Sequence, residues 1–132
     1  MEIPKKVSGK YFSAEELECK CGGAPLSCST PDFCDLLLSD LDELREEWRA
    51  PLWITSGKRC KNHNKRVNGH RRSAHLLGKA VDIKMFPKDY IKFIALIHRK
   101  SKHITGVGLG LKRGFIHLDT AHPERGARCW VY

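Results

Sequence analysis

The sequence from residue 73 to residue 85 reads SAHLLGKAVDIKM, and its second half has the pattern of a strand with two different faces. Side chains alternate between the two faces of a strand. One face carries Val81, Ile83 and Met85. Asp82 lies on the opposite face, so the pattern predicts a strand over residues 79–85 with one buried and one polar face. His75 precedes this strand across a turn at Gly78, which is expected to fold the imidazole back over the polar face.

A second segment, residues 114–120, reads GFIHLDT and alternates in the same way. Its aliphatic face carries Ile116 and Leu118, and its other face carries Phe115, His117 and Asp119. If the two strands are neighbours, Asp82 and His117 meet above the sheet, close to His75. Two imidazoles and one carboxylate suit a catalytic zinc ion and leave its fourth position for water. The sequence therefore predicts a metal site formed by His75, Asp82 and His117.

Apolar periodicity and capping residues predict the other elements. We expect helices over residues 14–18, from Pro31 onward with Thr30 as the cap, and over 88–100, and further strands over 52–55 and 107–111. These elements predict an α+β fold in which helices pack on a small, mostly antiparallel sheet. Residues 1–132 are expected to form a single domain, with the cysteine-containing segment of about residues 11–34 packed on it.

The composition narrows the class of protein. With 132 residues and a hydrophobic share of 41%, the chain suits one globular domain, and it contains no apolar run of the ~20 residues that a membrane span needs. Its net charge of +9 predicts an acidic partner, either an anionic cell envelope or nucleic acid. The basic residues are densest over 58–72, which is either a solvated loop or a binding patch.

The residues around the predicted ligands resemble those of a known family. The stretch from Ser73 to Asp82 has the form S-x-H-x-x-G-x-A-x-D, which is similar to the metal-binding signature of the zinc D-Ala-D-Ala carboxypeptidase family. That family shares its fold with the Hedgehog signalling domain. The likeness extends over Ser56–Arg59 with His63 and Asn64, over Gly106–Leu109, over Phe115–Thr120, and to Trp130.

The resemblance implies roles for individual residues. His75, Asp82 and His117 match the family's zinc ligands. Arg59 matches an arginine that holds the substrate carboxylate or polarises its carbonyl, as a guanidinium fork can. Ser73 is a candidate for substrate binding, and its hydroxyl also suits the cap of the turn before His75.

The general base is left open by the sequence. Many relatives carry a carboxylate three residues before the second histidine ligand, where this chain has Gly114. Asp119 is the nearest substitute. It is either the base that takes a proton from water or a partner that orients a ligand imidazole. His70 and His122 lie near these segments and are further proton donors to consider.

The resemblance implies a zinc-dependent peptidase that hydrolyses D-amino-acid-containing peptide bonds of peptidoglycan. An endopeptidase is favoured over a D-Ala-D-Ala carboxypeptidase, since a compact basic chain suits a bacteriophage lysis enzyme. The N-terminal sequence MEIPKK lacks the apolar core of a signal peptide, so we expect synthesis in the cytoplasm and action on the wall after release. A monomer is expected. The alternative is a catalytically inactive, zinc-containing binding module of the Hedgehog type, and nucleic-acid binding is a third, disfavoured hypothesis.

The chain has six cysteines, four of which lie near the N-terminus: Cys19, Cys21, Cys28 and Cys34. Four clustered thiolates suit a second, structural zinc ion. Disulfides formed after release and inert buried thiols are the other two interpretations.

Overall fold

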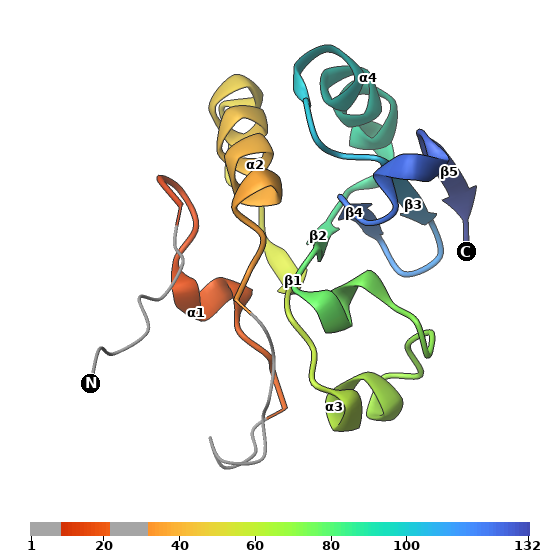
Figure 1. Cartoon of the computed structure of the whole chain (residues 1–132). Helices are drawn as coiled ribbons and strands as arrows, with labels where there is room; N and C mark the ends of the chain where they lie inside the picture. Colours follow the sequence, from red (N-terminus) through yellow and green to blue (C-terminus); the bar gives the residue numbers. More distant parts are fainter. Residues whose placement is uncertain (1–8, 22–31) are drawn as a thin grey trace.

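A five-stranded sheet flanked by helices forms the centre of the molecule (Figure 1). The computed structural model describes residues 9–21 and 32–132. The elements follow in the order α1 (Ala14–Leu17), α2 (Asp35–Trp48), β1 (Ile54–Ser56), α3 (Lys61–Arg66), η1 (Ala74–Leu77), β2 (Ala80–Lys84), η2 (Pro87–Asp89), α4 (Tyr90–Lys100), β3 (Gly106–Gly110), β4 (Phe115–Asp119), η3 (Pro123–Arg125) and β5 (Arg128–Val131). The predicted α+β class is confirmed.

The sheet has the strand order β1-β2-β4-β3-β5. The pairs β1–β2, β2–β4 and β3–β4 are antiparallel, and only the edge strand β5 runs parallel to its neighbour β3. The prediction of a mostly antiparallel sheet is therefore confirmed. β5 was not predicted, because its four residues RCWV show no clear apolar alternation.

Helices α2 and α4 cover one face of this sheet and lie side by side in Figure 1. They bury apolar side chains against the aliphatic faces of β2 and β4 in one continuous core: Leu37, Leu41, Leu44, Phe93, Leu96, Val81, Ile83, Ile116 and Leu118. Each such side chain stabilises the fold by about 1.5–3 kcal/mol relative to leaving it exposed. Because strand side chains alternate, this packing leaves Asp82 and His117 on the opposite face.

Helix α2 begins at Asp35, four residues later than predicted. Cys34 has an extended backbone, and its N–H donates to the carbonyl oxygen of Gly78 at 2.8 Å. Phe33 is buried in the core. The chain thus contacts the turn before β2, and the helix begins only after that contact. The predicted cap Thr30 and the predicted first residue Pro31 lie outside the described residues.

The N-terminal helix α1 is short but well capped. Ser13 and Glu16 form a capping box, in which each side chain accepts a backbone N–H of the other residue. Leu17 is buried, and its carbonyl oxygen accepts the N–H of Lys58 at 2.9 Å. This bond ties the end of α1 to the loop between β1 and α3. Over the described ranges, no helix has both the length and the apolar character to cross a membrane.

Candidate metal centre

Asp82 and His117 lie directly opposite each other on the paired strands β2 and β4. His75 reaches them from the short helix η1, which ends at Gly78 in the left-handed conformation, with φ of 68°. A Cβ atom at position 78 would lie 2.6 Å from the carbonyl oxygen of Asp32, so both the turn and the close packing require glycine. Ser73 caps η1 by accepting the N–H of His75 at 3.2 Å. The predicted convergence of the three side chains is confirmed.

One carboxylate oxygen joins the two imidazoles. The Oδ1 atom of Asp82 lies 3.1 Å from Nε2 of His75 and 3.1 Å from Nδ1 of His117. All three ligand atoms lie within 4.8 Å of one another, and the three residues are buried. A cation held there would have three protein ligands.

In each imidazole, the nitrogen that points away from Asp82 has a hydrogen-bond partner that determines the tautomer of the ring. Nδ1 of His75 lies 2.7 Å from the carbonyl oxygen of Gly57, which can only accept a hydrogen bond, so this nitrogen carries the proton. Nε2 of His117 lies 2.7 Å from Oδ2 of Asp119 and donates to that carboxylate. In the neutral imidazoles, Nε2 of His75 and Nδ1 of His117 therefore present lone pairs toward Asp82.

These residues fit a zinc ion. Two ring nitrogens and a carboxylate oxygen converge on one point, and a positive charge there, from a protonated imidazole or from a bound cation, makes that arrangement favourable. Burial alone lowers the pKa of His117, but hydrogen bonds to Asp119 and Asp82 outweigh it and raise that pKa above its usual value. Burial likewise opposes the charged form of Asp82, yet His117 and His75 hold its pKa well below the ordinary range. The donor set of two imidazoles and one carboxylate is one that zinc prefers.

Asp119 is fully engaged by its neighbours. Its Oδ2 accepts from His117, and its Oδ1 accepts from the guanidinium of Arg128 at 2.8 Å and the N–H of Ala121 at 3.2 Å. Burial raises its pKa, but the hydrogen bond and charge of His117 and the charge of Arg128 lower it overall. A Cβ atom at Gly106 would lie 2.5 Å from either carboxylate oxygen, so the neighbouring strand also encloses this side chain.

Arg59 holds the other oxygen of Asp82. Its Nη2 donates to Oδ2 of Asp82 at 3.1 Å, its Nε to the hydroxyl of Ser56 at 2.9 Å, and its Nη1 to Oδ1 of Asn64 at 3.2 Å. Burial lowers the pKa of Arg59 and attraction to Asp82 partly restores it, and the guanidinium stays charged at all ordinary pH. The arginine is thus anchored at the edge of the centre.

The centre lies in a cleft of about 570 Å³. Besides the ligands, its walls come from Thr55, Arg59, residues 67–70, Ser73, residues 110–113, Phe115 and Tyr132. Asp82 is the sole carboxylate among the described residues of this lining. His70 lies on its exposed rim and accepts the N–H of Arg72, whereas His122 lines a smaller neighbouring pocket and pairs with Glu124.

Two residues of the site, Arg128 and Tyr132, were not predicted from the sequence. Both belong to the C-terminal segment. In this segment every second side chain, namely Arg128, Trp130 and Tyr132, lies on the face of the sheet that carries the metal centre. The Trp130 ring lies 5.3 Å from that of His117, and Tyr132 lies 5.3 Å from Phe115. Burial raises the pKa of Tyr132. These large side chains recur at every second position, but the pattern begins with the charged Arg128 and therefore differs from the apolar alternation that usually identifies a strand.

The sequence model of the family described as peptidase M15 matches residues 10–119, which include all three predicted ligands. The chain belongs to the peptidase M15 family. It is therefore a member of a family of zinc-dependent metallopeptidases, and the family resemblance seen in the sequence is confirmed. A search of curated proteins found no match.

The structure groups the cysteines differently from the sequence prediction. Cys19 and Cys21 lie together with Cys60, their sulfur atoms all within 4.8 Å of one another. Cys34 was predicted to join this cluster, but its sulfur contacts the hydroxyl of Thr120 at 3.6 Å instead. The prediction failed for Cys34 because this residue pairs with the turn before β2. Cys28 lies outside the described residues.

Proposed function

We propose that this M15 peptidase hydrolyses peptide bonds of bacterial peptidoglycan with a zinc ion held by His75, Asp82 and His117. The observation that carries the proposal is the convergence of two imidazole lone pairs and a carboxylate oxygen within the cleft. A zinc ion bound there would lower the pKa of a water molecule and polarise the scissile carbonyl.

Asp119 is proposed to orient His117 rather than to act as the general base. Both of its oxygens already accept hydrogen bonds, from His117, Arg128 and the backbone. A carboxylate that receives a proton from His117 fixes the tautomer of this imidazole and makes its other nitrogen a better ligand.

Arg59 and Ser73 are proposed to position the reacting groups. Arg59 fixes the second oxygen of Asp82 and lines the cleft, so its charge lies near the carbonyl or carboxylate of a bound peptide. Ser73 holds η1 and thereby His75, and it lines the same cleft, where it can also contact substrate.

An endopeptidase is favoured over a carboxypeptidase by the space around the centre. The main cleft continues into a second pocket of about 280 Å³, and the two share His70, Ser73, His117 and Tyr132 in their linings. A peptide can therefore extend on both sides of the metal centre. A carboxypeptidase instead needs a closed end that accommodates a terminal carboxylate.

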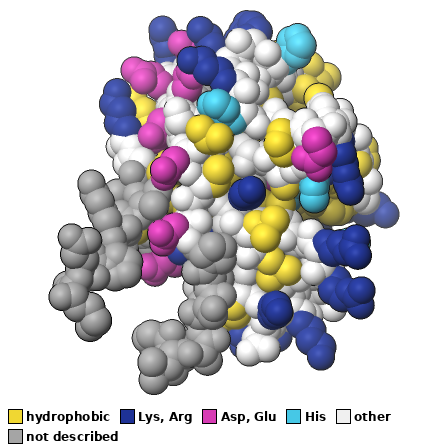
Figure 2. Space-filling view, viewed as in Figure 1, with side chains coloured by type: hydrophobic (Ala, Val, Ile, Leu, Met, Phe, Trp, Pro, Cys, Tyr) yellow, Lys and Arg dark blue, Asp and Glu magenta, His cyan; other side chains and the backbone are white. Residues whose placement is uncertain are grey.

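The surface charge supports an anionic cell wall as partner. Lys and Arg side chains gather beside α3 and the loop that follows it, at the lower right of Figure 2. The exposed members are Lys61, Lys65, Arg66, Arg71 and Arg72. This patch adjoins the cleft rim at residues 67–70, so long-range attraction brings an anionic polymer toward the site.

Mass spectrometry of peptidoglycan digested by the purified protein, with and without a chelator, tests this proposal. We expect chelator-sensitive release of peptides, with opened cross-links for an endopeptidase. Free D-Ala would instead identify a carboxypeptidase. One zinc ion bound at this centre without products from several wall types would contradict the peptidase and favour the Hedgehog-type binding module.

A further inference from the structure

A second group of potential metal ligands lies outside the catalytic cleft. Cys19 and Cys21 follow α1 on alternate residues, and Cys60 precedes α3. Their three sulfur atoms lie within 4.8 Å of one another. Tetrahedral zinc with bonds of about 2.3 Å to sulfur requires sulfur–sulfur separations of roughly 3.8 Å, so only a small inward shift is needed.

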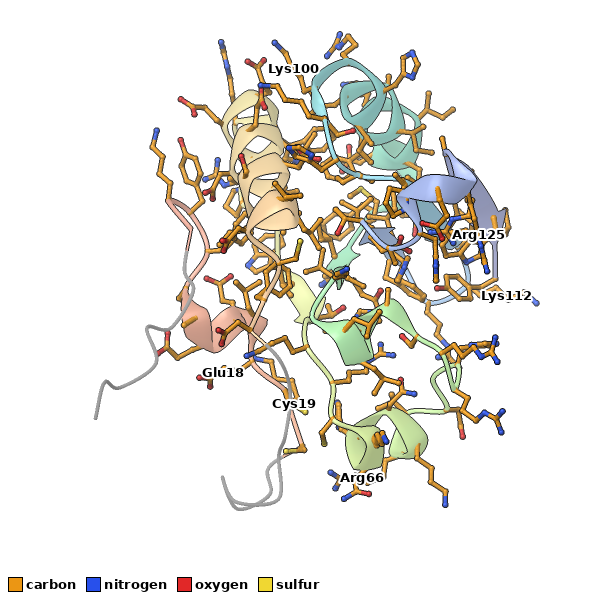
Figure 3. The ribbon with its side chains drawn as sticks, in the orientation of Figure 1. Glu18, Cys19, Arg66, Lys100, Lys112 and Arg125 are labelled. Atoms are coloured by element: carbon orange, nitrogen blue, oxygen red, sulfur yellow. The ribbon has the colours of Figure 1, made fainter. Side chains whose placement is uncertain are left out.

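Hydrogen-bond donors and positive charges surround these sulfurs. The N–H of Cys60 donates to Sγ of Cys19 at 3.2 Å, and the N–H of His63 donates to Sγ of Cys60 at 3.4 Å. Arg59 is attracted to Cys19, and Nη2 of Arg66 donates to the carbonyl oxygen of Cys21 at 2.9 Å. Nearby arginines balance the negative charge of a metal–thiolate group. Figure 3 shows Cys19 facing α3, the helix that carries Arg66.

We propose that Cys19, Cys21 and Cys60 bind a second, structural zinc ion through at least three thiolates. Thiolates are ligands that zinc prefers in closed structural sites. The proposal concerns folding and positioning, and it does not depend on which bond the enzyme cleaves.

The zinc ion would clamp the N-terminal segment onto the loop that supports the catalytic centre. This loop carries Gly57, whose carbonyl accepts from His75, and Arg59, which holds Asp82. The end of α1 already contacts it, because a Cβ atom at Gly57 would lie 2.5 Å from the carbonyl oxygen of Leu17. A metal ion bound by Cys19, Cys21 and Cys60 would join the same two segments at a second point, at Cys60.

Metal analysis of the purified full-length chain, combined with zinc X-ray absorption spectroscopy, tests the proposal. We expect two zinc ions per chain and a sulfur shell at about 2.3 Å. Because absorption averages the two sites, three thiolates on one of the two ions correspond to about 1.5 sulfur neighbours per zinc. Cys60→Ser and Cys19→Ser should each lose one zinc ion and the sulfur shell. The exposed Cys129 provides the matched control, since Cys129→Ser should retain both ions and the sulfur shell.

The proposal is also tested on the wild-type chain, in which zinc is replaced by cobalt(II). A thiolate-to-cobalt charge-transfer band in the near ultraviolet is expected, and this result needs no variant to fold. Bound zinc without sulfur neighbours would overturn the proposal, as would a disulfide within the three cysteines in the freshly purified protein. Because none of these measurements uses peptidase activity, their failure is distinct from failure of the proposed function.

Discussion

The two clusters of potential ligands differ in the backbone that holds them. Asp82 and His117 face each other on paired strands, and His75 adjoins them on a tightly closed turn. Cys19, Cys21 and Cys60 come instead from a segment after a short helix and from a helix cap. In the first cluster, strand register fixes which side chains meet. In the second, two irregular segments must first dock. The difference suggests that the histidine centre is formed by the fold, whereas metal binding helps to form the cysteine centre.

Removing one histidine ligand should have the largest effect on activity. His117→Ala leaves two ligands and should lower peptidase activity by more than about 10⁴-fold, the scale of losing an essential catalytic group. Hydrolysis assays on peptidoglycan with zinc in excess measure this loss. The zinc–sulfur shell should remain unchanged in this variant. Loss of both metal ions together would show that the two clusters are not independent.

A variant of Asp119 tests how much the hydrogen-bond partner of a ligand histidine contributes to zinc binding. Asp119→Asn should weaken zinc binding by about 10- to 100-fold, because His117 loses the carboxylate that orients it. Competition with a chelator measures the affinity, and activity should return when more zinc is added. Unchanged zinc affinity, with loss of the group that titrates on the acid side of the pH–rate profile, would instead identify Asp119 as the general base.

Arg59 links the two clusters, since it donates to Asp82 and lies near Cys19. Arg59→Lys keeps the charge but replaces the planar fork by a single ammonium group, which cannot reach Ser56, Asn64 and Asp82 together. Losing one charged hydrogen bond of about 1.5 kcal/mol corresponds to a roughly tenfold fall in kcat/KM. Steady-state kinetics on a peptidoglycan fragment tests this, with zinc content expected to stay constant. Wild-type kinetics for the lysine variant would show that the guanidinium fork is dispensable.

Cys60→Ser should have the smallest effect on activity and a clear effect on stability. Losing a zinc ion that is present at about 100 times its dissociation constant lowers the free energy of unfolding by roughly 2.7 kcal/mol. Urea unfolding followed by circular dichroism measures the change, and Cys129→Ser should remain within about 0.5 kcal/mol of wild type. Equal stability of both serine variants would argue against a structural metal.

The convergence of His75, Asp82 and His117 could be predicted from the sequence because the geometry that brings them together is local and periodic. Alternation placed Asp82 and His117 on the polar faces of two strands, and the glycine turn placed His75 over them. The start of α2 could not be predicted, because it depends on a hydrogen bond from Cys34 to the distant Gly78. The proximity of Cys60 to Cys19 was missed for the same reason. Cys60 lies 41 positions from Cys19, and nothing in the spacing shows that the two segments meet.

Anomalous diffraction from crystals of the active, zinc-loaded protein at the zinc absorption edge tests the central claim most directly. We expect a zinc peak bounded by Nε2 of His75, Oδ1 of Asp82 and Nδ1 of His117, with Nε2 of His117 still bonded to Asp119, separate from any peak at Cys19, Cys21 and Cys60. An active protein with no zinc peak at this position, or with zinc bound through Nε2 of His117, would contradict the assignment of this centre.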